Sequence, residues 1–172
     1  MKSLVRAGYV IIFFFAGILT APQPICADPP DKVELSERCA VCGMFVAKYP
    51  NWVTQIQYAG GPQKYFDGFK DLMAHYFSPE SYGVTRNLVA KEIWVKDYYS
   101  LEWIDGRAAF YVVGSDVFGP MGNEFIPFSK REAAENFLKD HKGQKILVFD
   151  DITSEMVESM RFGQKMKGHM VK

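Results

Sequence analysis

The sequence predicts an α+β fold in which two strand-strand-helix-strand units pack into one compact domain after an N-terminal signal peptide. The composition is that of a globular protein, since hydrophobic residues make up 48% and charged residues 23% of the 172 positions. Residues 52–58 alternate with the two-residue period of a strand, whereas apolar residues between Phe69 and Phe77 recur at helical spacing. The same order of elements then appears a second time, which predicts paired units.

The first unit is expected to hold two strands, a helix and a third strand. Gly60-Gly61-Pro62 is a turn signal between the first two strands, and Asp67 is a good N-cap for the helix. Ser78-Pro79 should end that helix, because the residue before a proline disfavours helical geometry. His75, near the helix end, is expected to be an ordinary polar residue. The expected ranges are strands at 52–58, 63–66 and 88–97 and a helix at 69–77.

The second unit repeats this order along residues 108–149. Ser129 is predicted to cap its helix, with Glu132 in the capping-box position, and Gly143 is predicted to end it. His141, at the end of this helix, is expected to be an ordinary polar residue. The expected ranges are strands at 108–113, 125–128 and 145–149 and a helix between 129 and 143.

The N-terminus has the pattern of a secretory signal peptide. Lys2 and Arg6 precede an apolar run at 9–19 that is short for a bilayer span. Cleavage after Ala27 removes two of the 20 basic residues, leaving 18 against 20 acidic ones, and periplasmic export is predicted. One alternative is a lipoprotein anchored in the membrane through Cys26, although Ile25 stands where a lipidation box has a small residue. The other alternative is an uncleaved anchor.

The charge balance and the motifs exclude several classes of partner and activity. Twenty Lys and Arg residues balance twenty Asp and Glu residues, whereas nucleic-acid-binding domains are usually strongly basic. No nucleic-acid partner is therefore expected. Neither a Ser-His-Asp signature nor a phosphate-binding loop occurs. Asp97, Glu102 and Asp105 lie in an aromatic-acid cluster, but their spacing defines no catalytic pair. We therefore expect that the protein is not an enzyme.

The strongest chemical signal is Cys39-Ala40-Val41-Cys42-Gly43-Met44, which places two thiols and a thioether within six positions. Gly43 lets the chain turn without a Cβ clash, and the spacing lets both thiols face one ion. A zinc ribbon needs a second cysteine pair and haem attachment needs a histidine after Cys42, and neither occurs. Thiolate and thioether ligands select Cu(I), which favours a soft-metal site.

Two other interpretations of the cysteine pair stay open. Exported proteins lie in an oxidising compartment, where Cys39 and Cys42 would form a structural disulfide. Alternatively, the pair acts as a thiol-disulfide oxidoreductase, which requires a low pKa at one cysteine. A Cu(I) site requires instead that each thiol loses its proton on binding, at about 2 kcal/mol per thiol at pH 7.

The methionines divide into candidate ligands and packing residues. Met121 is a candidate ligand, because a loop bounded by glycine and proline is a poor place to bury a methionine. Met73 lies on the apolar face of the first helix and is expected to pack in the core. The C-terminal stretch is read as a docking helix with a frayed tail, or alternatively as an auxiliary Cu(I) site. The candidate ligands of that auxiliary site are Met166, His169 and Met170.

At Cys39-Ala40-Val41-Cys42-Gly43-Met44-Phe45 the chain resembles the NosL family, accessory proteins of nitrous oxide reductase maturation. The resemblance covers residues 38–152. It rests on the cysteine motif in combination with Pro120-Met121-Gly122, since either motif alone is weak. The other matching stretches are Phe66-Asp67, Asp97-Tyr98, Trp103-Ile104-Asp105, Ala109-Phe110-Tyr111-Val112, Pro127-Phe128 and Glu132-Ala133-Ala134.

The resemblance implies an exported, non-enzymatic Cu(I) metallochaperone of denitrification that hands copper to nitrous oxide reductase or a related copper enzyme. It implies paired strand-strand-helix-strand units, similar to organomercurial lyase. Family members are commonly lipoproteins, so the resemblance supports the alternative in which Cys26 is the lipidated residue. A homodimer that shares one copper ion stays open, because one chain offers few ligands. The matching metal-ligand candidates are Cys39, Cys42, Met44 and Met121.

The sequence is thus expected to divide into four segments. Met156 and Met160, four residues apart, would share one face of the C-terminal helix. The expected segments are a signal peptide at 1–27, an N-terminal segment with the cysteine motif at 28–51, a NosL-like α+β domain at 52–152, and a C-terminal helix with a tail containing Met and His at 153–172.

Overall fold

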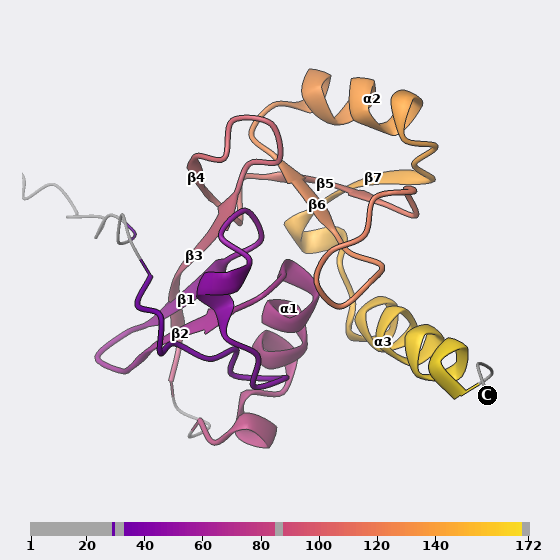
Figure 1. The fold of residues 1–172 in the computed structure, drawn as a ribbon. Coiled ribbons are helices and arrows are strands. Elements are labelled where there is room, and N and C mark those ends of the chain that lie inside the picture. The colour runs from indigo at the N-terminus through magenta and orange to yellow at the C-terminus, as the bar shows by residue number, and fades with distance from the viewer. Residues whose placement is uncertain (1–28, 30–32, 85–87, 170–172) are drawn as a thin grey trace, which may run out of the picture.

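The structure, a computed structural model, describes residues 29, 33–84 and 88–169, with 163–169 described by their backbone alone. Two antiparallel sheets and the helices packed on them form this part of the chain (Figure 1). None of its helices is long and apolar enough to span a bilayer. The elements are η1 Val46–Lys48, β1 Thr54–Tyr58, β2 Gln63–Phe66, α1 Phe69–Phe77, η2 Pro79–Tyr82, β3 Ala90–Lys96, β4 Trp103–Asp105, β5 Phe110–Val113, β6 Ile126–Phe128, α2 Arg131–Asp140, β7 Lys145–Val148, η3 Phe149–Asp151 and α3 Ser154–His169.

Each sheet is built around the first strand of its unit. In the first sheet β1 lies between β2 and β3, and β4 pairs with the far side of β3, which gives the order β2-β1-β3-β4. In the second sheet β5 lies between β6 and β7. The helices α1 and α2 each connect the second strand of a unit to its third. The predicted α+β fold with two strand-strand-helix-strand units is therefore confirmed.

Strand β4 is an element that the sequence did not predict, because three residues are too few to show a period. It contains Asp105 of the aromatic-acid cluster, in which Asp97 proves to be a structural residue. The Asp97 carboxylate accepts hydrogen bonds from the backbone N–H groups of Tyr99 and Ser100, at 3.0 and 2.9 Å. Its second oxygen accepts a bond from the N–H of Ser129 at 2.7 Å, so Asp97 ties the first unit to the start of α2.

The predicted N-cap of α1 is wrong. Gly68 occupies the cap position and offers no side chain to the helix. Asp67 lies one residue earlier, and its carboxylate instead accepts hydrogen bonds from the thiol of Cys42. The Asp67 side chain, which local sequence rules assign to the helix cap, is therefore used in a tertiary contact instead. The predicted end of the helix before Ser78-Pro79 is confirmed.

Both predicted ends of α2 need correction. Lys130 occupies the N-cap position without a side-chain hydrogen bond, so Ser129 is not the cap and its capping box with Glu132 does not form. The physical reason is the hydrogen bond from the N–H of Ser129 to the carboxylate of Asp97, which fixes Ser129 against the first unit. At the other end the helix stops at Asp140, with His141 as its C-cap, and Lys142, with φ 55°, makes the left-handed turn, so Gly143 is not the residue that ends the helix.

His75 is not an ordinary polar residue at a helix end, because it is fully buried. Its Nδ1 lies 3.0 Å from the hydroxyl of Tyr58, and the rings of Phe66 and Tyr82 pack against it. Burial lowers the pKa of His75 to about 4, so the ring stays neutral at physiological pH. His141 lies at the C-cap of α2, as predicted.

The two units share a hydrophobic core, and a smaller separate cluster of buried residues lies between α2 and the second sheet. Phe69 in α1 stacks on Tyr111 in β5, with ring centroids 4.1 Å apart, and the edges of Phe125 and Phe149 close around it. Met73, one turn further along α1, is fully buried, which confirms its predicted core position. Because Phe69 and Tyr111 belong to different units, the fold depends on their packing together.

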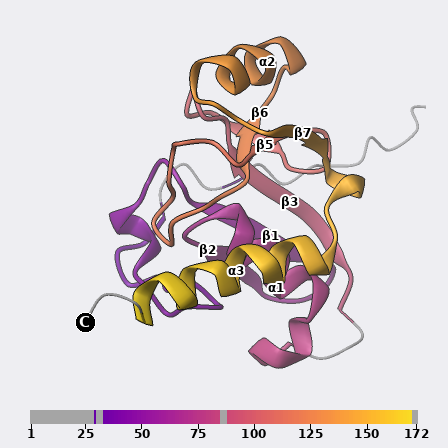
Figure 2. The ribbon, with the colours of Figure 1, turned by 90° about the vertical axis from the view of Figure 1, so that its right-hand side faces the viewer.

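Helix α3 runs beside α1, as Figure 2 shows. Val157 is buried in the shared core and Met160 packs against it. Met156 is 37% exposed, and it lines a surface hollow together with Met160, so the two methionines share one face as predicted. The expected docking helix is therefore present. It brings Arg161 to the first helix turn of α1.

Candidate metal centre

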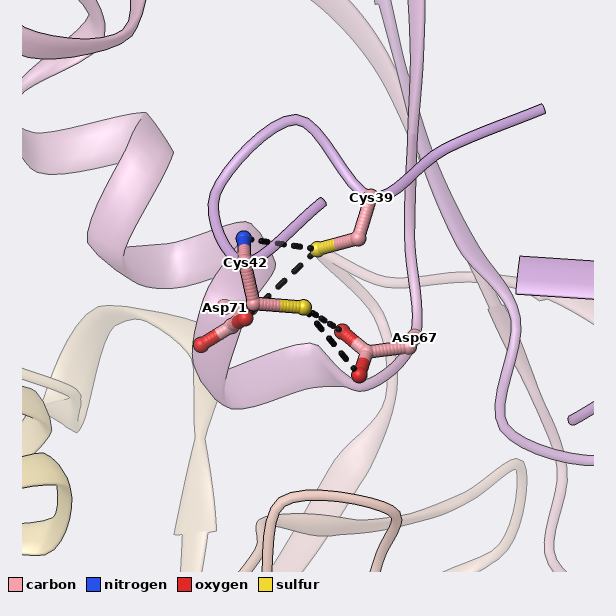
Figure 3. Close-up of side chains that lie close together, drawn as sticks. All are labelled: Cys39, Cys42, Asp67 and Asp71. Carbon is pink, nitrogen blue, oxygen red and sulfur yellow. Dashed lines mark hydrogen bonds between the residues drawn. The ribbon is translucent and has the colours of Figure 1, made fainter. Parts of the chain in front are cut away.

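The cysteine motif forms a closed loop between Arg38 and Phe45, which pair as an isolated antiparallel bridge. Inside the loop the N–H of Cys39 donates to the carbonyl of Met44 at 2.8 Å, and the N–H of Gly43 donates to the carbonyl of Cys39 at 2.9 Å. Gly43 has φ 78°, in the left-handed region that favours glycine. The loop therefore turns back on itself and brings both cysteines to one side (Figure 3).

The loop is attached to the strand that leads into α1. The N–H of Ala40 donates to the carbonyl of Tyr65 in β2 at 3.0 Å, two residues before Asp67. This backbone bond gives the loop a fixed position relative to the β2–α1 connection. The thiols consequently face the residues of that connection and of the first turn of α1.

Both cysteines are free thiols in this structure. Cys39 is buried, at 3% exposure, whereas Cys42 is half-buried. The N–H of Cys42 points at the sulfur of Cys39, at 3.5 Å. A sulfur that accepts a backbone N–H is held in place and is partly compensated when it carries negative charge. The two thiols are thus close, fixed and unequal in their access to solvent.

Two carboxylates complete the cluster. The thiol of Cys42 lies 3.4 Å from both oxygens of Asp67, and the thiol of Cys39 lies 3.5 Å from an oxygen of Asp71. One ligand atom from each of these four residues lies within 4.8 Å of the other three. Figure 3 shows the four side chains converging from the cysteine loop, from the β2–α1 connection and from the first turn of α1. We call these four residues the thiol–carboxylate cluster.

Burial and negative charge keep the thiols protonated. Burial raises the pKa of Cys42 to about 11, and the carboxylates of Asp67 and Asp71 add to the effect. Burial raises the pKa of Cys39 further. Burial and the charge of Asp67 also raise the pKa of Asp71. In the absence of a cation each thiol therefore donates a hydrogen bond to a carboxylate, and a cation would replace those protons.

A cation from α3 partly balances this charge. The Nε of Arg161 lies 4.0 Å from an oxygen of Asp71, and its Nη1 lies 3.1 Å from the hydroxyl of Tyr82. Asp71 is buried, so this ion pair is better shielded from solvent than an exposed pair. The C-terminal helix therefore contributes to the electrostatics of the thiol–carboxylate cluster.

Sequence reasoning missed Asp67 and Asp71 as members of the site. It assigned Asp67 to the helix cap, where an aspartate is common, and assigned no role to Asp71. The available signal was their spacing, since Asp67 stands just before the predicted helix and Asp71 follows four residues later in its first turn. The spacing alone does not show that these residues meet the cysteine loop.

The methionine candidates lie in different surroundings. Met44 follows Cys42 by two residues and is half-buried. Met121 is 38% exposed, and its carbonyl accepts a hydrogen bond from Lys70 in the first turn of α1. The side chains of Met166 and His169 lie outside the described part of α3, and Met170 lies outside the described residues altogether.

Comparison with known proteins decides the family. A family model described as NosL matches residues 30–157, which is most of the chain. The chain therefore belongs to the NosL family. The family model includes the cysteine loop, both sheets and the first residues of α3. The resemblance inferred from the cysteine motif and the Pro120-Met121-Gly122 loop is confirmed.

Two NosL proteins and one solved NosL structure are similar to this chain. A Stutzerimonas stutzeri protein named copper-binding lipoprotein NosL is 27% identical over 139 residues, which cover 74% of this chain and 70% of that protein. A protein of the same name from Achromobacter cycloclastes is 34% identical over 128 residues, covering 67% and 63%. The crystal structure of the copper chaperone NosL from Shewanella denitrificans has a TM-score of 0.61 and 27% identity, over 74% of this chain and 99% of that one.

Proposed function

We propose that this NosL-family protein is an exported metallochaperone that binds Cu(I) through Cys39 and Cys42 and carries it to a copper enzyme. The observation that carries this proposal is the pair of free thiols held side by side in one closed loop. Thiolate sulfur is the ligand that Cu(I) prefers in proteins. The three similar NosL proteins, which are named for copper binding or as a copper chaperone, support the choice of metal.

The cluster suits a cargo that must be taken up and released. A thiolate pair binds Cu(I) strongly, but protons compete for both sulfurs because their pKa values lie far above 7. Asp67 and Asp71 are hard oxygen ligands that Cu(I) does not favour, so their role here is to accept the thiol hydrogens in the metal-free protein. Met44 and Met121 are the proposed thioether ligands.

The surroundings of the thiols disfavour a thiol-disulfide oxidoreductase. Such an enzyme needs a thiolate near neutral pH, and its reactive cysteine usually lies at a helix N-terminus or beside a cation. Cys42 lies in a loop beside two carboxylates, and its pKa is raised to about 11. Binding and delivery of an ion therefore fit the site better than catalysis.

A Cu(I) titration tests the proposal directly. The reduced mature domain is titrated with Cu(I) under anaerobic conditions against a competing chromophoric chelator, and the complexes are weighed by native mass spectrometry. We expect one copper per chain, or one per dimer if two protomers share the ion. Failure of the protein to take Cu(I) from the chelator would overturn the proposal.

The apparent Cu(I) affinity should rise with pH. Below its pKa a thiol must release its proton before the sulfur binds the metal, so each binding thiol contributes about one logarithmic unit of affinity per pH unit. Between pH 6 and 8, two thiols predict a rise of about ten-thousandfold and one thiol a rise of about a hundredfold. Competition titrations corrected for the chelator's own protonation measure the slope. A flat profile would contradict thiol ligation.

Met121→Leu should weaken Cu(I) binding by about tenfold, which corresponds to loss of about 1.4 kcal/mol. Leucine keeps the size of the side chain and removes the thioether, a ligand that carries no proton. Met156→Leu is the matched control, because Met156 is exposed to almost the same degree, at 37% against 38%. Equal affinities of both variants in the competition titration would exclude Met121 as a ligand.

We propose nitrous oxide reductase or a related copper enzyme as the recipient. A transfer assay tests this: the loaded protein is mixed with the copper-free enzyme, the two are separated by gel filtration, and copper is measured in each fraction. A variant lacking both cysteines is the control for copper that exchanges through solution. Equal transfer with the wild type and the control would contradict specific delivery.

We propose periplasmic export by the N-terminal segment, which lies outside the described residues. The lipoprotein names of the two similar proteins support membrane attachment through Cys26 as the alternative. Fractionation of cells that express the full chain distinguishes the two. Cys26→Ser should leave a periplasmic protein unchanged and should release a lipoprotein from the membrane fraction.

A further inference from the structure

The loop that carries Met121 is a tight turn with a defined shape. Gly119 and Gly122 exchange two backbone hydrogen bonds, at 2.7 and 3.0 Å, across Pro120-Met121. Gly122 has φ 79°, which glycine adopts without strain. The proline restricts the backbone at the second position of the turn. The turn therefore presents the side chain of Met121 at the surface from a rigid backbone.

A buried lysine ties this turn to the start of α1. Lys70 is only 1% exposed, and its Nζ donates to the carbonyls of Met121 and Asn123, at 2.7 and 2.9 Å. A buried ammonium group is costly unless its hydrogens are bonded, so these contacts are strong constraints on the turn. Lys70 lies in sequence between Asp67 and Asp71, the two carboxylates of the thiol–carboxylate cluster.

A buried glutamate just after the turn, Glu124, also binds to the start of α1. The Oε1 of Glu124 accepts the N–H of Lys70 at 2.6 Å and the N–H of Phe125 at 2.9 Å. The Glu124 carboxylate thus accepts an N–H of the first turn of α1, where the N-cap residue Gly68 has no side chain to do so. A Cβ at Gly68 would overlap the Glu124 carboxylate, and one at Gly119 would lie 3.2 Å from its Cγ. Both glycines therefore permit the close approach of the turn to α1.

We propose that Lys70 and Glu124 are positioning residues that hold the Met121 turn beside the thiol–carboxylate cluster, so that the Met121 thioether reaches an ion bound by the thiols. The inference rests on the proposed function. It follows from a shared anchor at the start of α1. In the first turn of the helix Asp71 accepts the thiol of Cys39 and Lys70 binds the Met121 turn, and Asp67, which accepts the thiol of Cys42, lies three residues before Lys70. A ligand fixed in advance binds with less loss of conformational entropy than one on a mobile loop.

A double-mutant cycle on Cu(I) affinity tests the proposal. Lys70→Met removes the two carbonyl contacts at similar volume and is measured with and without Met121→Leu. We expect about a tenfold loss of Cu(I) affinity in the chain with Met121, and almost none when Met121 is already replaced, because the two residues act on the same ligand. Lys91→Met, at an exposed lysine of β3, controls for the loss of one positive charge.

The outcomes separate this inference from the proposed function. A Lys70→Met effect of equal size in both backgrounds, or no effect in either, would overturn it. If Lys70→Met does not fold, the double variant Lys70→Met/Glu124→Gln takes the place of Lys70→Met in the cycle, because it removes both buried charges together. If the wild type binds no Cu(I), the proposed function fails. Hydrogen exchange at the Gly122 amide then tests whether Lys70 holds the turn. Unchanged protection of this amide in the Lys70 variant would overturn the positioning role as well.

Discussion

Cys39→Ser and Cys42→Ser should each weaken Cu(I) binding by about a hundredfold or more, because changes in outer-shell residues alone already cost about 10- to 100-fold in metal affinity. The serine hydroxyl keeps the shape of the thiol and replaces a soft ligand by a hard one that Cu(I) does not favour. Anaerobic competition titration gives the affinity, and far-UV circular dichroism shows whether the fold is kept.

Ala40→Ser is the matched control for these two variants. It adds a hydroxyl to the same closed loop and leaves both sulfurs, so its Cu(I) affinity should equal that of the wild type. Cys39 is buried and Cys42 is half-buried, so comparison of their variants also shows which sulfur contributes more. If both cysteine variants bound Cu(I) like the wild type, the carrier function would be wrong.

Phe69→Ala should lower the free energy of unfolding by about 3–5 kcal/mol, which is the usual effect of removing a large buried aromatic side chain. Phe69 is 1% exposed and contacts rings from β5, from the loop before β6 and from η3. Its removal would leave a cavity between the two units, which the surrounding backbone elements cannot fill. Chemical denaturation followed by circular dichroism measures the change.

Phe162→Ala is the control, since Phe162 is 57% exposed and its loss should change stability by less than about 0.5 kcal/mol. The wild type should unfold in one transition, because the two units share the core around Phe69. Two separate transitions, or a loss below about 1 kcal/mol for Phe69→Ala, would show that the units are independent.

The fold followed from local patterns to a large extent. The alternation in β1, the apolar face of α1 and the repeated element order predict both units, because strand and helix periods are properties of neighbouring residues. The predicted N-caps at Asp67 and Ser129 failed for a common reason. Each residue is drawn into a contact with a residue distant in sequence, which local capping rules do not include.

The cysteine motif was visible in the sequence because its geometry is local. The N–H of Gly43 bonds to the carbonyl of Cys39, four positions earlier, and a glycine with positive φ closes the loop. The identity of the two thiols, the close placement of Met44 and the expectation of a soft metal therefore needed no tertiary information. These features, with the Met121 loop, also identified the family.

Only the tertiary structure decided what surrounds the thiols. Cys42 meets Asp67 across 25 positions, Cys39 meets Asp71 across 32, and Lys70 meets Glu124 across 54. Such contacts depend on how the loop, α1 and the second unit pack. By itself the sequence determined the paired-unit fold and the candidate soft ligands. Packing decided their burial, their carboxylate partners and the anchoring of the Met121 turn, because these depend on distances between segments that no local period encodes.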